Sequence, residues 1–460
     1  MGIDYEDDDE DEMLRRAFRT RNRSFSSRGK PDYDCADDDD AEQVVILNLI
    51  FGSLALLSLA LTLWQWLVAR RFPLHQRGPE PSTPSPQPPV TLLKPLKGCD
   101  AATEDCLRSW FAQRYAGPTQ ILFGVASAED PVCGIVRKLL EEFPGHDARL
   151  VVCGPLLGAN AKVSKLVELE RSAKYDVLII SDADVRVPPD FLTSVVAPLC
   201  TDGPSSPMQQ ARTRFPASPD SEGGSSNLGS RGRSPSQRTG LVCSFYRLAN
   251  PTTLAMQWEA IAINADFWSQ VLQSRSLKPI DFALGAVMAT RRQQLQEVGG
   301  FRALADCLAD DYQLGNRIAR RGYSIALAPV VVECWSAAMG WAAVWKHQLR
   351  WARTIRVCQP APYFFSVLSN ATFWPLLWLI VKPSLPVLAC ALACFLVRVL
   401  TALNLQQRLT RRRPPCALGW LVPIKDLLQA AIWLLAFAGN RIEWRGERMR
   451  LRPDGTLVRG

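Results

Sequence analysis

The sequence contains Ser181-Asp182-Ala183-Asp184-Val185 directly after Tyr175-Asp176-Val177-Leu178-Ile179-Ile180. The earlier run is short, apolar and rich in β-branched residues, which predicts a buried strand of a parallel sheet. Side chains two residues apart in an extended segment point the same way, so we expect Asp182 and Asp184 to share one ion. Hard carboxylate ligands suit Mg²⁺ or Mn²⁺, completed by water and substrate phosphates. The triplet alone is also compatible with a surface turn, in which Asp is common.

Short apolar strands alternate with helical stretches over residues 90–335. This alternation predicts an α/β fold with a mostly parallel, Rossmann-like sheet covered by helices. Ligands of such sheets bind beyond the carboxyl ends of the strands. Asp130, Asn160, Lys162 and Asp182 each follow a predicted strand, so we expect them to converge on one crevice. The predicted strands are 90–93, 120–126, 148–153, 176–180, 241–246, 283–290 and 324–332.

Composition indicates a protein that lies partly in a membrane. The chain has 460 residues, of which 47% are apolar and 14 are Trp, and its net charge is +8. Acidic blocks fall near the start, whereas Arg and Lys flank the apolar segments, a pattern that favours an anionic membrane surface over nucleic acid as the partner. The 13 Cys form no CxxC pair and the 3 His are dispersed. We therefore expect buried free thiols in a reducing compartment and no His-based metal site.

The first part of the chain divides into segments of different composition. Residues 1–41 are polar and acidic, which predicts a disordered tail because they cannot bury enough apolar surface. Residues 44–68 are almost wholly apolar and long enough for one transmembrane helix, and 79–89 form a Pro-rich linker. Arginines follow the apolar helix, which places the domain at 90–335 in the cytoplasm. An insertion at 201–240, rich in Ser, Pro and Gly, is expected to be disordered.

The chain returns to the membrane after the α/β domain. Residues 338–358 predict a basic, Trp-rich amphipathic helix at the membrane interface, and 363–440 carry two to three further membrane helices. Arg398, inside the second apolar run, is costly there unless it is paired. Lys425-Asp426 interrupts the third run, which leaves a span, a re-entrant helix or an interfacial helix open. The basic tail at 441–460 favours the cytoplasmic side, in conflict with a simple third span.

Five short motifs occur along the chain: Lys94-Pro95-Leu96-Lys97-Gly98-Cys99-Asp100, Glu129-Asp130-Pro131, Asp182-Ala183-Asp184, Asp310-Asp311-Tyr312 and His347-Gln348-Leu349-Arg350-Trp351. In order and spacing they resemble the ceramide glucosyltransferase-like family, glycosyltransferase family 21, whose members have the GT-A fold. They are most similar to the bacterial hopanoid-biosynthesis branch of that family. The resemblance extends over roughly residues 44–457, outside the insertion.

The resemblance implies roles for the aspartates of these motifs. Asp130 would hold the nucleotide base, and Asp182 with Asp184 would bind the divalent ion on the diphosphate of a UDP-sugar. The family's third aspartate matches Asp311 rather than Asp310.

The last motif departs from the family at one position. It begins with Gln or Arg in the ceramide enzymes and with His347 here, which weakens the case for ceramide as the acceptor. Arg350 and Trp351 match the family. Asp310, His347 and Gln348 are assigned to the motifs or to the acceptor side of the site.

Chemistry independent of the resemblance supports several of these roles. An acceptor hydroxyl is a poor nucleophile and needs a carboxylate to take its proton. Asp311, at the mouth of a predicted helix, is the candidate base, with a plain helix cap as the alternative. One base and direct attack imply inversion at the sugar carbon. We expect Asn160 and Lys162 to meet the ribose or diphosphate, Arg350 to brace the diphosphate, and Trp351 to close over the sugar or lipid head.

The sequence therefore predicts a membrane-bound inverting glycosyltransferase that moves a single hexose or N-acetylhexosamine from a UDP-sugar to a hydroxyl of a membrane lipid, ceramide or a hopanoid polyol. One alternative is a processive polysaccharide synthase, which would carry more membrane helices and a Gln-x-x-Arg-Trp motif. Another is a non-catalytic membrane scaffold with a degenerate domain, which the retention of Asp130, Asp182 and Asp311 opposes.

Overall fold

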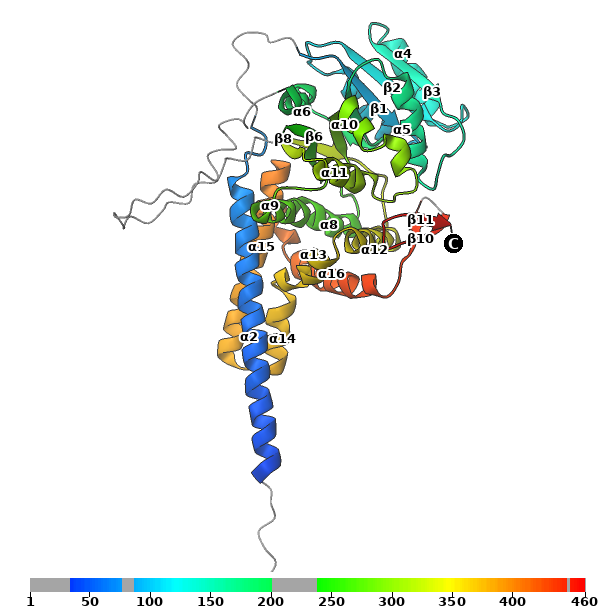
Figure 1. Cartoon of the computed structure of the whole chain (residues 1–460). Helices are drawn as coiled ribbons and strands as arrows, with labels where there is room; N and C mark the ends of the chain where they lie inside the picture. The colour runs from blue at the N-terminus through cyan, green and yellow to red at the C-terminus, as the bar shows by residue number, and fades with distance from the viewer. Residues whose placement is uncertain (1–33, 77–86, 201–237, 445–446, 460) are drawn as a thin grey trace, which may run out of the picture.

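The computed structural model describes residues 34–76, 87–200, 238–444 and 447–459 (Figure 1). Most of the predicted disordered tail, Pro-rich linker and insertion lies outside these residues. The described end of the tail differs from the prediction, because helix α2, Asp34–Arg71, begins well before residue 44. Acidic residues occupy its first turns in sequence, and a helix N-terminus favours negative charge.

Within the described residues, an eight-stranded sheet with the order β3-β2-β1-β4-β7-β6-β8-β5 forms the centre of the soluble domain. Strands β1 to β4 run parallel, β6 is parallel to β8, and β7 and β5 are antiparallel to their neighbours. The predicted α/β architecture is confirmed. The strands are β1 Val90–Pro95, β2 Thr119–Val125, β3 Asp147–Val152, β4 Val177–Ser181, β5 Val185–Arg186, β6 Thr239–Leu248, β7 Val287–Arg291 and β8 Ser324–Cys334.

Helices cover both faces of the sheet, with an apolar core layer on each face. One layer contains α3, α4 and α6, and the other contains α5, α9 and α11 (Figure 1). The helices of the soluble domain are α3 Thr103–Phe111, α4 Val132–Glu142, α5 Ala161–Ser172, α6 Phe191–Cys200, α8 Leu254–Ile261, the π-helical η1 Ala262–Phe267, α9 Trp268–Leu277, α10 Arg292–Glu297, η2 Phe301–Leu304, α11 Asp310–Arg320 and α12 Trp341–Cys358.

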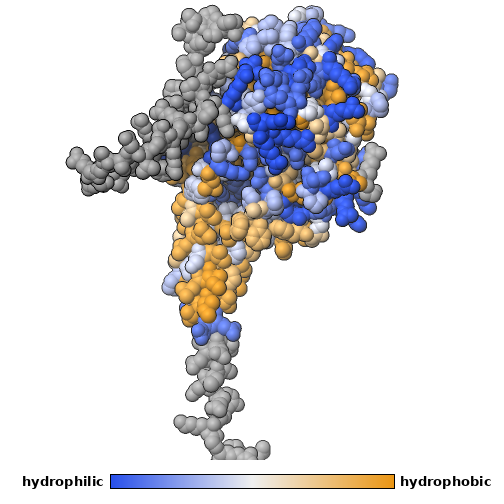
Figure 2. All heavy atoms as spheres, in the orientation of Figure 1, coloured by the Kyte–Doolittle hydropathy of each residue, from blue (hydrophilic) through white to orange (hydrophobic). Residues whose placement is uncertain are grey.

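A bundle of apolar helices projects from the soluble domain (Figure 1), and Figure 2 shows it as an apolar stalk. Among the described residues, two helices are long and apolar enough to cross a membrane, Glu42–Arg71 of α2 and α15, Leu385–Thr410. Helix α13, Pro360–Phe365, continues through η3, Ser366–Ser369, into α14, Phe373–Val381, with a bend of 57° that makes a third candidate span. Counting the bent pair once, this agrees with one N-terminal and two C-terminal membrane helices.

The third apolar run forms α16, Leu421–Phe437, which lies across the base of the soluble domain (Figure 1). Its interrupting charges are buried in a four-residue cluster. Arg398 pairs with Asp266 at 2.9 Å and with Asp426 at 2.8 Å, and Lys425 pairs with both carboxylates. The cluster joins α15, η1 and α16, so Arg398 has the partners that its position requires. Helix α16 has 17 residues and is not among the candidate spans found in the described part of the chain.

The tail at 441–460 forms a three-stranded antiparallel sheet of β9 Arg441–Trp444, β10 Glu447–Leu451 and β11 Leu457–Arg459. Its apolar side chains pack against Leu308, next to the start of α11. The described part of the tail therefore lies against the soluble domain.

Helix α12, which the sequence predicts to lie at the membrane interface, also contacts the C-terminal tail. Lys346 pairs with Glu443 at 2.9 Å. Arg353 donates to Arg441 O at the start of β9, and Arg356 donates to Asn440 Oδ1 just before it. Helices α16 and α8 pack against α12. Large apolar side chains are also exposed on α13 and in the α16 region, namely Phe364, Phe365, Trp420, Ile424, Leu434 and Phe437. The underside of the soluble domain is apolar in Figure 2.

We expect Arg398→Met to destabilise the protein by about 3 to 5 kcal/mol, because it leaves two buried carboxylates facing Lys425 alone. Thermal unfolding of the full chain in detergent measures this effect. Arg413→Met removes an exposed arginine that follows the same helix and is the matched control, with an expected change within about 0.5 kcal/mol. Equal stability of the two variants would show that the cluster does not hold α16.

Candidate active site

Carboxylates from two distant segments meet around one buried lysine. Lys162 Nζ lies 2.8 Å from Asp182 Oδ1 and 3.2 Å from Asp310 Oδ2, and its side chain is only 10% exposed. Asp182 follows β4, whereas Asp310 begins α11. Burial by itself lowers the pKa of Lys162, but Asp182 and Asp310 outweigh it and hold the pKa above its usual range. We call Lys162, Asp182, Asp184, Asp310 and Asp311 the carboxylate site.

The segment that leads into β7 brings Asp311 close to Asp182. Ala286 O accepts a hydrogen bond of 3.2 Å from Asp182 N. Its neighbour Gly285 lies against the Asp311 carboxylate, since a Cβ at that position would be 2.5 Å from Asp311 Oδ2. A side chain larger than hydrogen therefore does not fit without displacing the carboxylate. Gly285, which contacts the predicted base Asp311, is thus followed directly by Ala286, which contacts the predicted metal ligand Asp182.

Asp311 is the second residue of α11, whose cap is Ala309, so the plain-cap alternative is wrong. Asp311 Oδ1 accepts a hydrogen bond of 2.8 Å from Tyr312 N. Among the described residues, no cation lies within ion-pair distance of Asp311. Burial, and then the neighbouring charge of Asp310, raise the pKa of Asp311 to about 6, against the opposing effect of Lys162. A carboxylate with this pKa is suited to take a proton near neutral pH.

Asp184 lies two residues after Asp182, within electrostatic range of it. Desolvation by the surrounding protein, and then the charge of Asp182, raise the pKa of Asp184 to about 6. Two carboxylates that repel each other in this way are a fitting donor set for a divalent cation. Within the described part of the chain, no group of three or more His, Cys, Asp or Glu is arranged to hold a metal. The pair therefore fits Mg²⁺ or Mn²⁺ only with water and substrate phosphates as the other ligands.

Lys94 contacts the backbone of the loop that carries Asp182. The sequence had assigned no role to this lysine. It is fully buried at the end of β1, with Nζ directed to Asp182 O and 3.3 Å from Ser181 Oγ. Burial lowers the pKa of Lys94 to about 8, against the opposing charges of its neighbours. A lysine within the apolar run Val90–Pro95 was the available signal.

Asn160, predicted to meet the ribose or diphosphate, caps helix α5 in the structure. It is fully buried, and its Oδ1 caps α5 by accepting from Lys162 N at 3.0 Å and Val163 N at 3.2 Å. Its Nδ2 donates to Cys307 O at 2.8 Å and lies 3.4 Å from Asp310 Oδ1. The side chain thus holds Lys162 and Asp310 in place.

Asp130 lies in the loop after β2, as predicted. Its carboxylate accepts hydrogen bonds from Gly98 N, at 3.0 and 3.1 Å, and from Val132 N at 3.1 Å. These contacts join the first two motifs and leave acceptor capacity on the two oxygens.

The His347 motif lies on α12 and contacts a carboxylate that the sequence analysis missed. Glu259, on α8, is only 1% exposed. Its Oε1 lies 2.6 Å from His347 Nδ1 and accepts from Gln348 Nε2 at 2.9 Å. The sequence signal for Glu259 was its position as a single acidic residue inside the apolar run of α8. Gln348 is buried and serves this contact.

Aromatic residues connect α12 to the carboxylate site. The Trp351 ring packs against Tyr246, Phe267 and His347, with the closest centroid separation, to His347, being 4.8 Å. Burial raises the pKa of Tyr246 well above its usual value, and Asp311 and Asp182 contribute to that rise. Tyr246 therefore lies within electrostatic range of both carboxylates.

The C-terminal end of α12 contacts the start of α11. Tyr312 OH donates to Cys358 O at 2.8 Å and accepts from Gln359 Nε2 at 3.0 Å. This contact is adjacent to Asp311. Arg350 is partly buried on the same helix, one residue from Trp351.

A comparison with family models matches residues 50–208 and 233–457 to glycosyl transferase family 21. The chain belongs to glycosyltransferase family 21. The predicted resemblance is therefore confirmed, and the GT-A type of α/β fold follows with it.

Curated relatives of this family 21 chain include ceramide glucosyltransferase 1 of Caenorhabditis elegans, 24% identical over 254 residues, which cover 55% of this chain and 46% of the relative. The ceramide glucosyltransferase of Komagataella phaffii is 33% identical over 149 residues, 30% of this chain and 29% of the relative. The chain matches less than half the length of these relatives. Among solved structures, a mannosyltransferase from Pyrobaculum calidifontis in complex with GDP-Man and Mn²⁺ has a TM-score of 0.46 and 18% identity, over 84% of this chain and 99% of that chain.

We expect Gly285→Ala to destabilise the protein by about 1 to 3 kcal/mol, because the new methyl group meets the Asp311 carboxylate. Most of this cost should disappear in an Asp311→Ala background, where the opposing oxygens are gone. Thermal unfolding of the two single variants and the double variant measures the coupling. Gly134→Ala is the control, since a Cβ there meets nothing within 4 Å. Additive effects at positions 285 and 311 would contradict the contact.

Proposed function

We propose that this chain is a membrane-bound, inverting glycosyltransferase that moves a single hexose or N-acetylhexosamine from a UDP-sugar to a hydroxyl of a membrane lipid. Ceramide and hopanoid polyols are the acceptor classes proposed. Family membership supports a sugar-transfer reaction, and the candidate membrane helices support a lipid acceptor. The basic residues Arg70 and Arg71 at the soluble-domain end of α2 favour a cytoplasmic catalytic domain.

The observation that carries the proposal is the position of Asp311. It lies beside the ion-paired group of Lys162, Asp182 and Asp310 but is not itself paired within the described residues. Asp310 and Lys162 are occupied with each other, so Asp311 is the carboxylate left to accept the proton of an attacking hydroxyl. Direct attack assisted by one base inverts the configuration at the sugar carbon.

Asp182 and Asp184 are the proposed ligands of Mg²⁺ or Mn²⁺. When bound, the ion would neutralise the charge that develops on the leaving UDP. Lys162 holds Asp182 in place and adds a positive charge beside the diphosphate position. Asp130 retains acceptor capacity for a donor N–H of the base, and Arg350 is proposed to brace the diphosphate.

The acceptor side is assigned to α12. Glu259 fixes the ring of His347, and the ring packs on Trp351, so these side chains present a rigid edge next to Tyr246. The apolar underside formed by α13 and α16 provides a surface along which a lipid reaches this edge. The motif of the ceramide enzymes begins with Gln or Arg, so His347 weakens the case for ceramide as the acceptor.

The two alternatives receive less support. A processive synthase needs a channel of several helices, whereas two or three candidate spans occur among the described residues. A degenerate scaffold has no need for the raised pKa of Asp311 or for a buried lysine between carboxylates.

We expect Asp311→Asn to lower transfer by at least about 10²-fold while UDP-sugar binding changes little, because the amide cannot accept the proton. Transfer is measured by mass spectrometry of the glycolipid product, and binding by calorimetry with UDP. Asp176→Asn, an exposed carboxylate before β4 that lies 3.7 Å from Arg292 Nε, is the control. Equal losses of transfer and binding would show that Asp311 is structural.

We expect kcat/KM for the donor to rise with pH through about 6 and then to level off. The base must be ionised to act, so protonation of Asp311, whose pKa is raised to about 6, removes activity on the acid side. The charged neighbours that set this value are Asp310, Lys162 and Asp182. The measurement is a pH–rate profile between about pH 5 and 8, the range in which proteins are usually most stable. A profile that stays flat through this range would exclude Asp311 as the base.

We expect chelation with EDTA to abolish transfer and added Mg²⁺ or Mn²⁺ to restore it. Asp184→Asn should raise the metal concentration needed for half-maximal activity, because it removes one of two protein ligands. Titration of activity against each metal measures both effects. Full turnover in EDTA would remove the metal assignment.

A further inference from the structure

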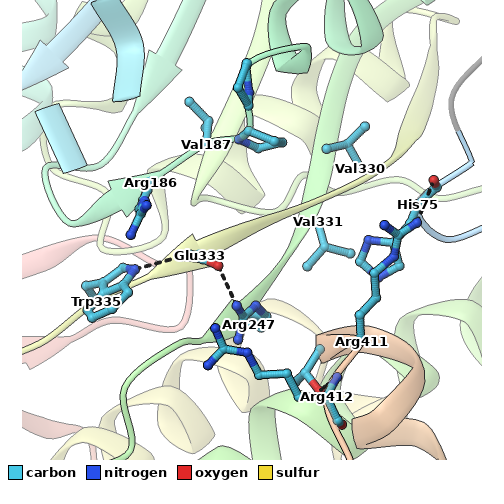
Figure 3. Close-up of a pocket in the computed structure, with 13 residues that line it drawn as sticks. His75, Arg186, Val187, Arg247, Val330, Val331, Glu333, Trp335, Arg411 and Arg412 are labelled. Carbon is cyan, nitrogen blue, oxygen red and sulfur yellow. Dashed lines mark hydrogen bonds and ion pairs between the residues drawn. The ribbon is translucent and has the colours of Figure 1, made fainter. Parts of the chain in front are cut away.

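Four arginines line a cavity where the soluble domain meets the membrane helices. Its volume is about 460 Å³, and it lies between the β5–β8 edge of the sheet and the chain that follows α2 and α15 (Figure 3). Arg186 comes from β5, Arg247 from β6, and Arg411 and Arg412 follow α15. We call it the arginine cavity. No residue of the carboxylate site lines it.

The charges of the arginine cavity are not balanced. Glu333 is the only acidic residue among the described residues that line it. Its carboxylate is already engaged, since it pairs with Arg247 through one oxygen and accepts from Trp335 Nε1 at 3.0 Å through the other (Figure 3). The positive charge of Arg186, Arg411 and Arg412 therefore exceeds the negative charge of the lining. Guanidinium groups bind phosphate oxygens through paired N–H donors, which makes a phosphate the fitting ligand.

A side chain covers carbonyl groups at the end of α15 that would otherwise repel an anion. A helix C-terminus exposes carbonyl oxygens with partial negative charge. His75 Nε2 lies 3.1 Å from Arg408 O and 3.1 Å from Leu409 O, so the imidazole covers two of these carbonyls. Arg411 Nη2 donates to His75 O at 3.1 Å, and His75 and Arg411 have φ values of 60° and 56°. Both are uncommon for residues other than glycine, which indicates that these contacts hold the corner in shape.

A second cavity indicates a lipid rather than free phosphate. It has a volume of about 220 Å³ and shares Arg247, Thr410 and Arg412 with the arginine cavity. It continues along α15 and is lined there by apolar residues such as Leu403 and Leu418. A cationic cavity that shares lining residues with a more apolar one, beside a helix long enough to span a membrane, matches a charged headgroup attached to an acyl chain. Free phosphate has no apolar group that could occupy the second cavity.

We propose that the arginine cavity binds the phosphate of an anionic phospholipid from the leaflet on the soluble-domain side, with the start of an acyl chain in the second cavity. The site is separate from the carboxylate site, and the proposed transfer reaction is not needed for it. The bound lipid would occupy a fixed position at the junction of α15, β5 and β8.

Native mass spectrometry of the full chain, delipidated in detergent, tests the proposal. The protein is titrated with phosphatidylglycerol, phosphatidylcholine, inorganic phosphate and UDP. We expect one phosphatidylglycerol to bind tightly and the double variant Arg411→Gln/Arg412→Gln to weaken it by about tenfold or more. Arg186→Gln, on a different element and outside the helix corner, should weaken it as well, so that local unfolding at the corner cannot produce the result alone.

Arg71→Gln is the matched control. Arg71 is exposed at the end of α2 but does not line the arginine cavity, so its removal should leave phosphatidylglycerol binding unchanged. An equal loss in this variant would mean general attraction to positive charge and would overturn the site. Equally tight phosphatidylcholine would show that the phosphate charge is not selected. Displacement of the lipid by equimolar inorganic phosphate or UDP would assign the cavity to a soluble anion and overturn the lipid proposal.

Discussion

The ion pairs of Lys162 connect the parts of the soluble domain on which the proposed chemistry depends. A buried ammonium is unfavourable unless carboxylates surround it, and here one carboxylate comes from the end of β4 and the other from the start of α11. Asn160 supports the same junction from the cap of α5. Because Lys162 satisfies Asp310 and Asp182, Asp311 is held nearby with no ion pair to the described part of the chain, and burial raises its pKa. The position of the proposed base thus follows from the pairing of its neighbours.

The membrane part of the chain bears on the same site. The buried cluster of Arg398, Lys425, Asp266 and Asp426 holds α16 against α15 and the π-helical turn of α8–α9. Helix α12 packs on α16 and α8 and ends against Tyr312, the residue after Asp311. The chain of contacts from the membrane helices to the proposed base is therefore continuous. A lipid acceptor requires such an arrangement, since its hydroxyl must reach the base without leaving the bilayer surface.

Local patterns predicted much of the fold and the main carboxylates. Buried strands that end in acidic residues mark Asp182, and the first-turn acids of α11 mark Asp310 and Asp311. The partners of these residues could not be predicted, because the contact between Lys162 and Asp310 joins segments far apart in sequence. Lys94 and Glu259 left a signal, since each is a lone charge in an apolar run.

The contacts of the helices near the membrane could not be predicted for a common physical reason. Amphipathic patterning does not distinguish a lipid surface from a protein surface, so it did not show that the basic residues of α12 contact the tail. The charges of α16 were ambiguous for the same reason, because their partners, Arg398 and Asp266, come from other helices. The cap role of Asn160 could not be told from a ligand role by sequence, because a cap and a ligand both place a polar residue at a helix start.

An experimental structure of the full chain with UDP and Mn²⁺, in which anomalous scattering locates the metal, is the most direct test that carboxylates from β4 and α11 serve one sugar nucleotide. We expect the metal at Asp182 and Asp184, with the diphosphate on the side that faces Asp311. UDP and Mn²⁺ bound elsewhere, for example in the arginine cavity with the carboxylate site unoccupied, would contradict a shared catalytic site.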